Sequence, residues 1–205
     1  MAGEKKALKG LKGSALFPVS VNTESAYQAG EKLKVPSAQA LSKTDEKEDY
    51  EIFADDDTYD AGSDYKYTTL DLTVAELDIS LEAQISGGTF DDQDGVYKAK
   101  STDIAPEYAL VYAALMTGGG YRMFRHPVVK LMSIAVEHTT KGDSNDIAAY
   151  TLSFRAMARK IDSVYREQKD ATKGEELTWL DSVPSLPEAG DGGEDDGGED
   201  DPENP

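Results

Sequence analysis

The sequence contains no cysteine, and only one tryptophan and two histidines, among its 205 residues. The lack of cysteine excludes disulfides, thiolate zinc sites and a cysteine nucleophile. Long apolar runs are missing too, since no window approaches the roughly 20 apolar residues of a membrane-spanning helix. The lysines near the start precede a segment too short and too polar for the apolar part of a signal peptide. We therefore expect a protein that is made in the cytoplasm and has no membrane partner.

Basic side chains are scarce, with 21 Lys and Arg against 40 Asp and Glu and a formal net charge of −19. The imbalance is local. Residues 45–94 carry −15, whereas residues 1–44 carry +4 and residues 95–187 carry +1. Binding to nucleic acid through its phosphates needs a basic face, and binding to an anionic membrane needs one too. Both kinds of partner are therefore disfavoured.

The last eighteen residues, 188–205, contain nine acids, five glycines, no base and a single apolar residue, Ala189. A segment of this composition buries too little apolar surface to offset its chain entropy. The sequence therefore predicts one folded domain, residues 1–187, followed by a flexible, disordered acidic tail, residues 188–205.

Apolar residues with a period of two predict a mainly β protein. Leu70, Leu72 and Val74 share one face of a strand expected over residues 66–74. Residues 107–116 are apolar on both faces, which is typical of a central strand covered on both sides. Residues 150–159 alternate more cleanly still, and further strands are predicted at residues 121–124 and 128–138, with weaker candidates at 17–21 and 50–54. For residues 128–138 we expect a break before the strand at His126 and Pro127, and one face formed by Val128, Met132, Ile134 and Val136.

One segment has the period of a helix. Leu77, Leu81 and Ile85 lie four residues apart, Asp78 is a suitable N-terminal cap, and glycines follow. Polar residues 36–49 and 139–146 are predicted to be long loops. Together these patterns predict an antiparallel β-sandwich or barrel with one short flanking α-helix.

Two acidic clusters raise the question of metal binding. Residues 91–95 resemble the middle of a calcium loop, but that alignment places Phe90 and Ser101 where ligating carboxylates are needed. A β-turn explains the Asp and Gly residues better. The second cluster consists of Asp55, Asp56, Asp57 and Asp60. Neighbouring side chains on an extended chain point in alternate directions, so these carboxylates converge poorly on one ion. We predict neither a metal nor a cofactor.

Catalytic signals are weak. Neither His126 nor His138 has a nucleophile at a recognisable motif spacing. Three consecutive glycines at residues 118–120 lack the Lys and Ser or Thr of a phosphate-binding loop and are expected to form a turn. Paired carboxylates cannot be identified from sequence among 40 acids. We therefore do not expect an enzyme.

The order of these elements resembles the major tail proteins of long-tailed, non-contractile bacteriophages, in the subfamily common among phages of Gram-positive hosts. Residues 53–60 (FADDDTYD) and the strand at 70–74 come first, then the helix at 77–85. They are followed by Gly-Gly-Thr-Phe at 87–90, an Asp-Gly turn, a strand from Ala105, Gly-Gly-Tyr-Arg at 119–122 and a late Lys-Gly-Asp loop. The resemblance covers roughly residues 10 to 170.

The resemblance implies a structural virion protein that forms stacked hexameric rings around a tape measure protein, with tail terminator and tip proteins as further partners. DNA would pass through the lumen without specific binding during ejection into the host. The fold implied is the tail tube β-sandwich, with an N-terminal arm over about residues 1–13. Its location would be the virion tail, assembled in the host cytoplasm.

By position, the resemblance places Asp55, Asp56, Asp57 and Asp60 in an acidic loop at a subunit contact or the lumen. It places Lys141, Gly142 and Asp143 in a ring-stacking loop. An alternative interpretation of the acidic loops and the eleven tyrosines is a monomeric β-sandwich binding module, for instance a calcium-modulated carbohydrate binder.

Overall fold

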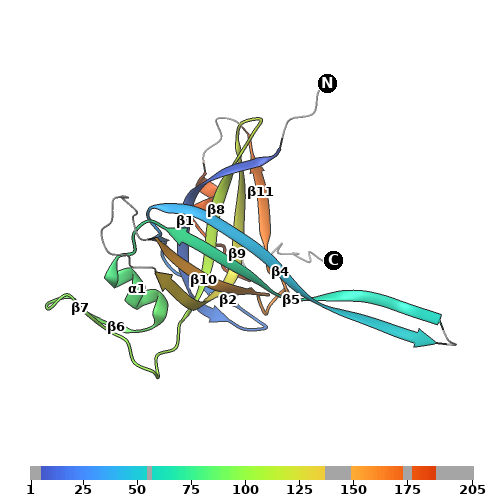
Figure 1. The fold of residues 1–205 in the computed structure, drawn as a ribbon, viewed down its shortest axis with the longest axis horizontal. Helices are drawn as coiled ribbons and strands as arrows, with labels where there is room; N and C mark the ends of the chain where they lie inside the picture. The colour runs from blue at the N-terminus through green and yellow to red at the C-terminus, as the bar shows by residue number, and fades with distance from the viewer. Residues whose placement is uncertain (1–5, 55–56, 137–148, 173–176, 188–205) are drawn as a thin grey trace, which may run out of the picture.

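The computed structural model describes residues 6–54, 57–136, 149–172 and 177–187. The strands in these ranges form one antiparallel nine-stranded sheet and one small hairpin (Figure 1). The main sheet contains β1 (Leu8–Asn22), β2 (Tyr27–Ala29), β3 (Leu33–Lys34), β4 (Ala38–Ala54), β5 (Asp57–Val74), β8 (Glu107–Met116), β9 (Tyr121–Val136), β10 (Tyr150–Met157) and β11 (Glu167–Ala171). The small hairpin contains β6 (Thr89–Asp91) and β7 (Val96–Lys98).

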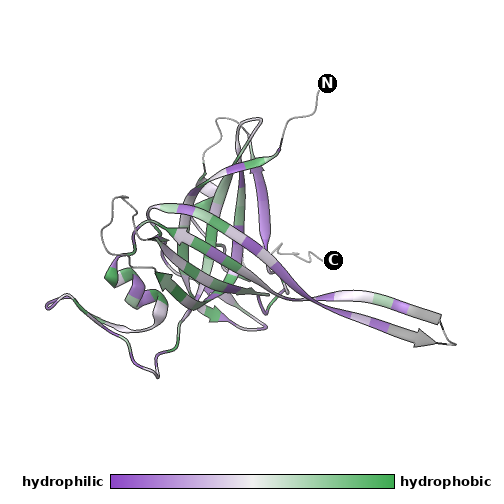
Figure 2. Ribbon diagram, in the orientation of Figure 1, coloured by the Kyte–Doolittle hydropathy of each residue, from purple (hydrophilic) through white to green (hydrophobic). Residues whose placement is uncertain are grey.

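The main sheet follows the order β2-β1-β8-β9-β10-β5-β4, with β11 also paired to β9 and β3 also paired to β1. It curls, because buried side chains from β1, β5, β8, β9 and β10 meet in one apolar cluster. Figure 2 shows that apolar residues concentrate in this curled body. The prediction of a mainly β, antiparallel fold is confirmed.

Strand β8 lies at the centre of the body and is buried on both faces. Tyr108, Leu110 and Tyr112 belong to the cluster inside the curl. Ala109 and Val111 belong to a second cluster on the other face, which the chain end around the 3₁₀ turn Thr178–Leu180 covers. A strand buried on both faces needs an apolar residue at every position, and this confirms the prediction for residues 107–116.

The helix α1 (Ile79–Ser86) closes one end of the inner cluster (Figure 1). The Asp78 carboxylate accepts hydrogen bonds from the backbone N–H groups of Ser80 and Leu81, and so satisfies donors that the first turn leaves open. Gly87 ends the helix in the left-handed region with φ 77°. A Cβ atom at this position would also lie 2.3 Å from the carbonyl oxygen of Ile104, so only glycine fits. The predicted helix and its cap are confirmed.

The break predicted at His126 and Pro127 is wrong, because β9 continues from Tyr121 to Val136. The β8–β9 register shifts between Tyr108 and Leu110, opposite Pro127, which identifies a β-bulge. A bulge tolerates the missing N–H of proline.

A second irregularity changes the face of the same strand. Opposite β10, Ser133 pairs with Ser153 but Leu131 pairs with Phe154, so Met132 is an extra residue. The predicted face of Val128, Met132, Ile134 and Val136 is therefore wrong. Met132 is 54% exposed, while Ile134 packs against the inner cluster.

The loop predicted over residues 36–49 is largely strand β4. The Asp and Glu side chains of this strand misled the prediction, because alternation marks only strands that have one buried face. Residues 46–51 of β4 are exposed and bury no such face. The loop predicted over residues 139–146 lies outside the described residues.

Candidate functional site

A long two-stranded arm projects from the body (Figure 1). Strand β5 pairs with β10 only over residues 68–74, whereas β4 pairs with β5 from Ala38 to Ala54. Among the described strands, residues 46–54 and 57–67 therefore pair only with each other. We call these two segments, with the two residues that join them, the arm. At about 3.3 Å per residue, the β4 half of the arm is roughly 30 Å long.

Several contacts hold the base of the arm firmly on the body. The Tyr65 ring stacks on Tyr165 with centroids 3.9 Å apart, and its hydroxyl donates to the backbone oxygen of Ala156 over 3.0 Å. The Thr68 hydroxyl donates to the Asp45 carboxylate over 2.7 Å. The two contacts of Tyr65 join β5 to β10 and to the segment after it, and the Thr68–Asp45 bond joins β4 to β5, so the arm is anchored where it leaves the body.

The Asp45 carboxylate is the charged centre of this base. It lies 2.5 Å from Lys43 Nζ and 3.5 Å from Arg166 Nη1. Partial burial raises the pKa of Asp45, but hydrogen bonds from Lys43 and Thr68 outweigh burial, so the pKa lies below its usual value. Asp45 therefore stays ionised at neutral pH and keeps these bonds.

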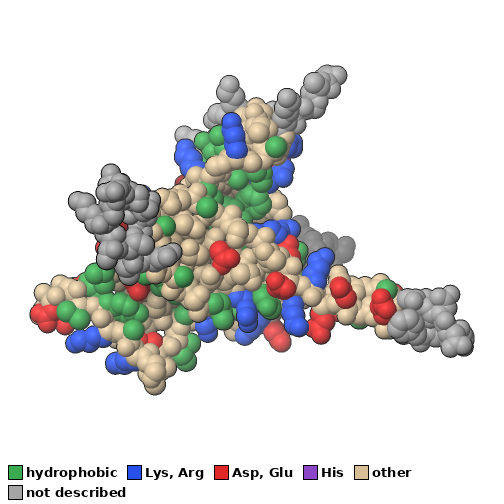
Figure 3. Space-filling view, viewed as in Figure 1, with side chains coloured by type: hydrophobic (Ala, Val, Ile, Leu, Met, Phe, Trp, Pro, Cys, Tyr) green, Lys and Arg blue, Asp and Glu red, His purple; other side chains and the backbone are tan. Residues whose placement is uncertain are grey.

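Acidic side chains dominate the arm. Residues 46–67 contain nine Asp and Glu against two Lys. Glu46, Glu48, Asp49, Glu51, Asp60 and Asp64 are exposed, and Figure 3 shows red side chains along the arm. One of them forms an ion pair, between Glu48 and Lys66 over 3.2 Å. The described part of the arm is thus an acidic ribbon, and it carries Asp57 and Asp60, two of the residues that the sequence singled out.

The structure places only part of the predicted site. Asp57 is the first residue of β5, and Asp60 is exposed opposite Ile52 on β4. Asp55 and Asp56 lie outside the described residues. Lys141, Gly142 and Asp143 also lie outside them, so their assignment to a stacking loop stays a prediction. The described part of the predicted N-terminal arm, residues 6–13, belongs largely to β1.

No group of three His, Asp or Glu side chains that could hold a metal occurs in the described ranges. The Asp91 to Gly95 segment forms the turn between β6 and β7, as predicted. The Asp91 carboxylate accepts from the N–H groups of Gln93 and Asp94, and Gly95 has φ 64°. This Asx-type turn explains why the segment is rich in Asp and Gly. None of the described helices is long and apolar enough to cross a membrane.

His126 is fully buried beside Tyr112, and the two rings are nearly parallel with centroids 6.1 Å apart. Burial lowers the pKa of His126 to about 4, and the positive charges of Arg166 and Lys43 act in the same direction. The imidazole is therefore neutral at pH 7 and packs as a core side chain.

This burial gives stability a pH dependence. In the unfolded chain His126 titrates near 6.5, so between pH 6.5 and pH 4 the unfolded state binds the proton and folding stability falls. Between pH 7.5 and pH 5 the loss attributable to His126 is about 2 kcal/mol. His126→Phe keeps the contact with Tyr112 and has no imidazole to titrate. In urea unfolding, we expect its free energy of unfolding to fall by about 2 kcal/mol less between pH 7.5 and pH 5 than that of the natural chain. The same pH dependence in both proteins would contradict this account.

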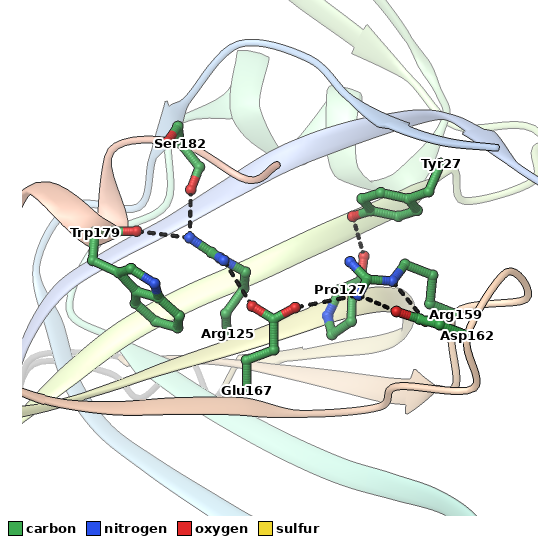
Figure 4. A network of polar contacts seen from close by, with 8 residues as sticks. All are labelled: Tyr27, Arg125, Pro127, Arg159, Asp162, Glu167, Trp179 and Ser182. Atoms are coloured by element: carbon green, nitrogen blue, oxygen red, sulfur yellow. Dashed lines mark hydrogen bonds and ion pairs between the residues drawn. The ribbon is translucent and has the colours of Figure 1, made fainter. Parts of the chain in front are cut away.

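Sequence reasoning missed the most buried charges in the described chain. Arg125 on β9 is 3% exposed and Arg159 is 4% exposed. The Glu167 carboxylate on β11 lies between them, 2.7 Å from Arg125 Nη1 and 3.3 Å from Arg159 Nη2 (Figure 4). The cross-strand pairing of Glu167 with Arg125 joins residues 42 positions apart. No local motif signals such a pair.

This cluster holds residues 177–187, the last segment that the structure describes. Arg125 Nη2 donates to the carbonyl oxygens of Trp179 and Ser182 over 2.9 and 2.8 Å, and the guanidinium lies 3.9 Å from the Trp179 ring centroid. Tyr27, whose hydroxyl donates to Pro127 O over 2.6 Å, completes the network in Figure 4. Each of these hydrogen bonds joins two protein groups, and none of these residues lines any of the four hollows that lie beside β1 or beside α1 in the described chain. We interpret the cluster as structural.

Comparisons with known proteins gave matches at the level of fold. No family model matches the chain, and no curated protein matches its sequence. A chain of the extended sheath–tube complex of PVC, an extracellular contractile injection system, is 9% identical with a TM-score of 0.39, covering 78% of this chain and 89% of that chain.

A chain of the anti-feeding prophage (AFP) baseplate is 10% identical with a TM-score of 0.41, covering 85% of this chain and 100% of its own. The crystal structure of an Hcp protein is 10% identical with a TM-score of 0.33, covering 78% of this chain and 100% of its own. At such low identities the likeness concerns the arrangement of strands alone.

Proposed function

We propose that this chain is a structural subunit that assembles with copies of itself into a tail tube of the phage type. The arm is the observation that carries the proposal. A two-stranded ribbon is at best marginally stable by itself in water, and the described arm adds no residue beyond its base to either core cluster. Contact with a second copy gives such a ribbon the packing that its own chain does not supply.

The edges of the main sheet support the same function. Its strand path ends at β4 and at β2, and among the described strands β4 pairs only with β5. An open edge presents a row of backbone donors and acceptors to another chain. A contact between two different surfaces of identical subunits produces a ring when the rotation closes and a filament when it does not. A tube of stacked rings uses both kinds of contact.

The finer features of the proposal come from the sequence resemblance. They are hexameric rings, a tape measure protein inside them, terminator and tip proteins at the ends, and a non-contractile virion tail from a phage of a Gram-positive host. Negative charge suits a channel through which DNA passes without binding, because it repels phosphates. We assign Asp57 and Asp60 to contact between subunits, since the arm carries them away from the body, and the sequence resemblance groups Asp55 and Asp56 with them.

Electron microscopy of the purified full-length protein, with sedimentation velocity on the same sample, tests the proposal. We expect rings or tubes whose abundance rises with protein concentration. Monomers that persist at high concentration would overturn it. A rise in melting temperature on adding calcium would favour the binding-module alternative instead, because a ligand that binds the folded state stabilises it by mass action.

Deleting residues 188–205 should ease assembly and leave the fold unchanged. The deletion removes nine acids and no base, so the formal charge per subunit falls from −19 to −10. Lower like charge reduces repulsion between subunits within about 8 Å at physiological ionic strength. The critical concentration for assembly should fall, with the melting temperature unchanged. A large loss of thermal stability would show that this segment belongs to the folded domain.

A further inference from the structure

An apolar groove of about 450 Å³ lies between the start of β1 and the body half of β4. Residues 8–11 form one wall and residues 39–41 form the other, while the Tyr112 and Phe124 rings, stacked 4.8 Å apart, line it from the interior side. Among the described strands no ladder joins β1 to β4. The groove is therefore the open seam of the curled sheet, and Figure 3 shows apolar side chains exposed at this end of the body.

A second hollow, of about 410 Å³, continues from the groove along β1 and shares Leu11 with it. Its other residues come from β1 up to Ser14 and from residues 32–38. The two hollows together are lined by five lysines and by no Asp or Glu. The lysines are Lys9, Lys12, Lys32, Lys34 and Lys43.

Two of these lysines already have carboxylate partners, since Lys32 pairs with Asp181 and Lys43 pairs with Asp45. Lys9, Lys12 and Lys34 form no ion pair with the described chain. The seam is thus apolar at its base and positively charged at its rim, on a protein whose net charge is −19. A ligand that fits it is an extended segment with both carboxylates and apolar side chains.

The arm has this chemistry. Along β4 the exposed carboxylates of Asp49 and Glu51 flank Tyr50, which is 40% exposed, and the apolar residues Ile52 and Phe53 follow in the sequence. The arm and the groove of one molecule cannot meet, because β4 forms the groove wall with residues 39–41 and continues outward as the arm from Glu46. The complementary surfaces must therefore come from different copies.

We propose that the arm of one copy lies in the β1–β4 groove of the next copy. This rests on the proposed self-assembly and names the surface that receives the arm. The lysines at the rim pair with carboxylates of the arm, and its apolar residues cover Tyr112 and Phe124. Since donor and acceptor surfaces differ, the contact is heterologous and continues from subunit to subunit.

The part of β1 that borders the groove contains two bulges, which favour recognition through side chains over regular strand pairing. The ladder between β1 and β8 shifts register between Lys9 and Leu11 and again between Lys12 and Ala15. Gly10 and Gly13 lie at these shifts with φ 66° and 69°, which identifies glycine bulges. Bulges prevent indiscriminate strand pairing at an open edge. Charge and apolar contact therefore select the arm.

Charge reversal tests the pairing. The groove variant combines Lys9→Glu, Lys12→Glu and Lys34→Glu, and its matched control combines Lys98→Glu, Lys100→Glu and Lys160→Glu at exposed positions elsewhere. We expect the groove variant to need at least about tenfold more protein to assemble than the control. Adding Asp49→Lys, Glu51→Lys and Asp60→Lys on the arm should restore assembly. Equal assembly by groove variant and control, with unchanged melting temperatures, would overturn the proposal.

Cysteine cross-linking locates the contact directly, because the natural chain has no cysteine. Gln39→Cys in the groove is mixed with Glu51→Cys on the arm, and the control mixes Gln39→Cys with Ile104→Cys, a 74% exposed position beside α1. We expect a disulfide-linked heterodimer from the first mixture only. Rings without this cross-link would overturn the groove while sparing the tube function. The cross-link without rings would support the groove and overturn the tube, and the absence of both would overturn both.

Discussion

Shortening the arm should abolish assembly and leave the body folded. The variant replaces residues 49–63 by Asn-Gly, so that Glu48 and Asp64, which pair directly across the ribbon, are joined by a two-residue turn. Such a turn matches the twist of the flanking strands. The anchors Tyr65, Thr68 and Asp45 are retained. We expect no rings or tubes at concentrations at which the full chain assembles.

Stability should change little in this variant, because none of the removed residues whose burial is described, 49–51 and 60–63, contributes to either core cluster. The melting temperature should stay within about 4 °C of the full chain, the shift that roughly 1 kcal/mol produces at this size. A second variant keeps the arm at full length and replaces its six acids between residues 49 and 63 with amides. If both variants fail to assemble, the contact depends on the carboxylates of the arm. If only the short-arm variant fails, the contact depends on the length of the arm and not on its charge. Normal assembly by the short-arm chain would contradict the role of the arm.

The sequence was sufficient to predict those elements whose pattern is set by burial. Strand β8 is apolar at every position after Glu107 because both of its faces are covered, and α1 combines a stripe of Leu and Ile with a capping Asp78. In each case the element can be predicted from residues that are close together in the sequence. The mainly β fold followed from these patterns.

The failures have physical causes as well. Residues 46–49 are predicted to be loop but belong to β4, where they are exposed and bury no face, so alternation, the usual sign of a strand, is absent from them. Bulges at Pro127 and Met132 keep β9 continuous and change the face that its later residues present. Of the candidate site, the sequence identified the acidic residues of the arm but missed the lysine-rimmed groove. Its walls come from residues about 30 positions apart, and its floor lies more than 70 positions further on.

Glu167→Ala should destabilise the fold far more than the removal of an exposed carboxylate. It removes the carboxylate shared by Arg125 and Arg159, whose side chains are 3% and 5% exposed. Removing one partner of a buried ion pair costs about 3 to 5 kcal/mol. Since the Glu167 side chain is 27% exposed, water compensates part of this, and we expect a loss of about 2 to 4 kcal/mol. Urea unfolding followed by circular dichroism measures it.

The matched control is Glu48→Ala, which removes the same side chain from an exposed ion pair. Glu48 and Lys66 are 3.2 Å apart with side chains 69% and 56% exposed, and exposed surface substitutions usually change stability by at most about 0.5 kcal/mol. Equal losses in the two variants would show that the Arg125–Glu167–Arg159 cluster contributes no more than a surface pair.

Hydrogen exchange shows whether Glu167→Ala destabilises one segment of the chain or the whole fold equally. Arg125 holds the carbonyl groups of Trp179 and Ser182, and the chain end continues to Leu186, whose N–H donates to Tyr27 O over 2.8 Å. When Glu167 no longer fixes Arg125, the segment that covers the second core cluster should open first, because local openings need less free energy than global unfolding. The Leu186 N–H should exchange faster in Glu167→Ala, whereas the N–H of Leu152, in the middle of β10, should change only by the global loss. An equal change at both positions would mean that the cluster supports the whole sheet.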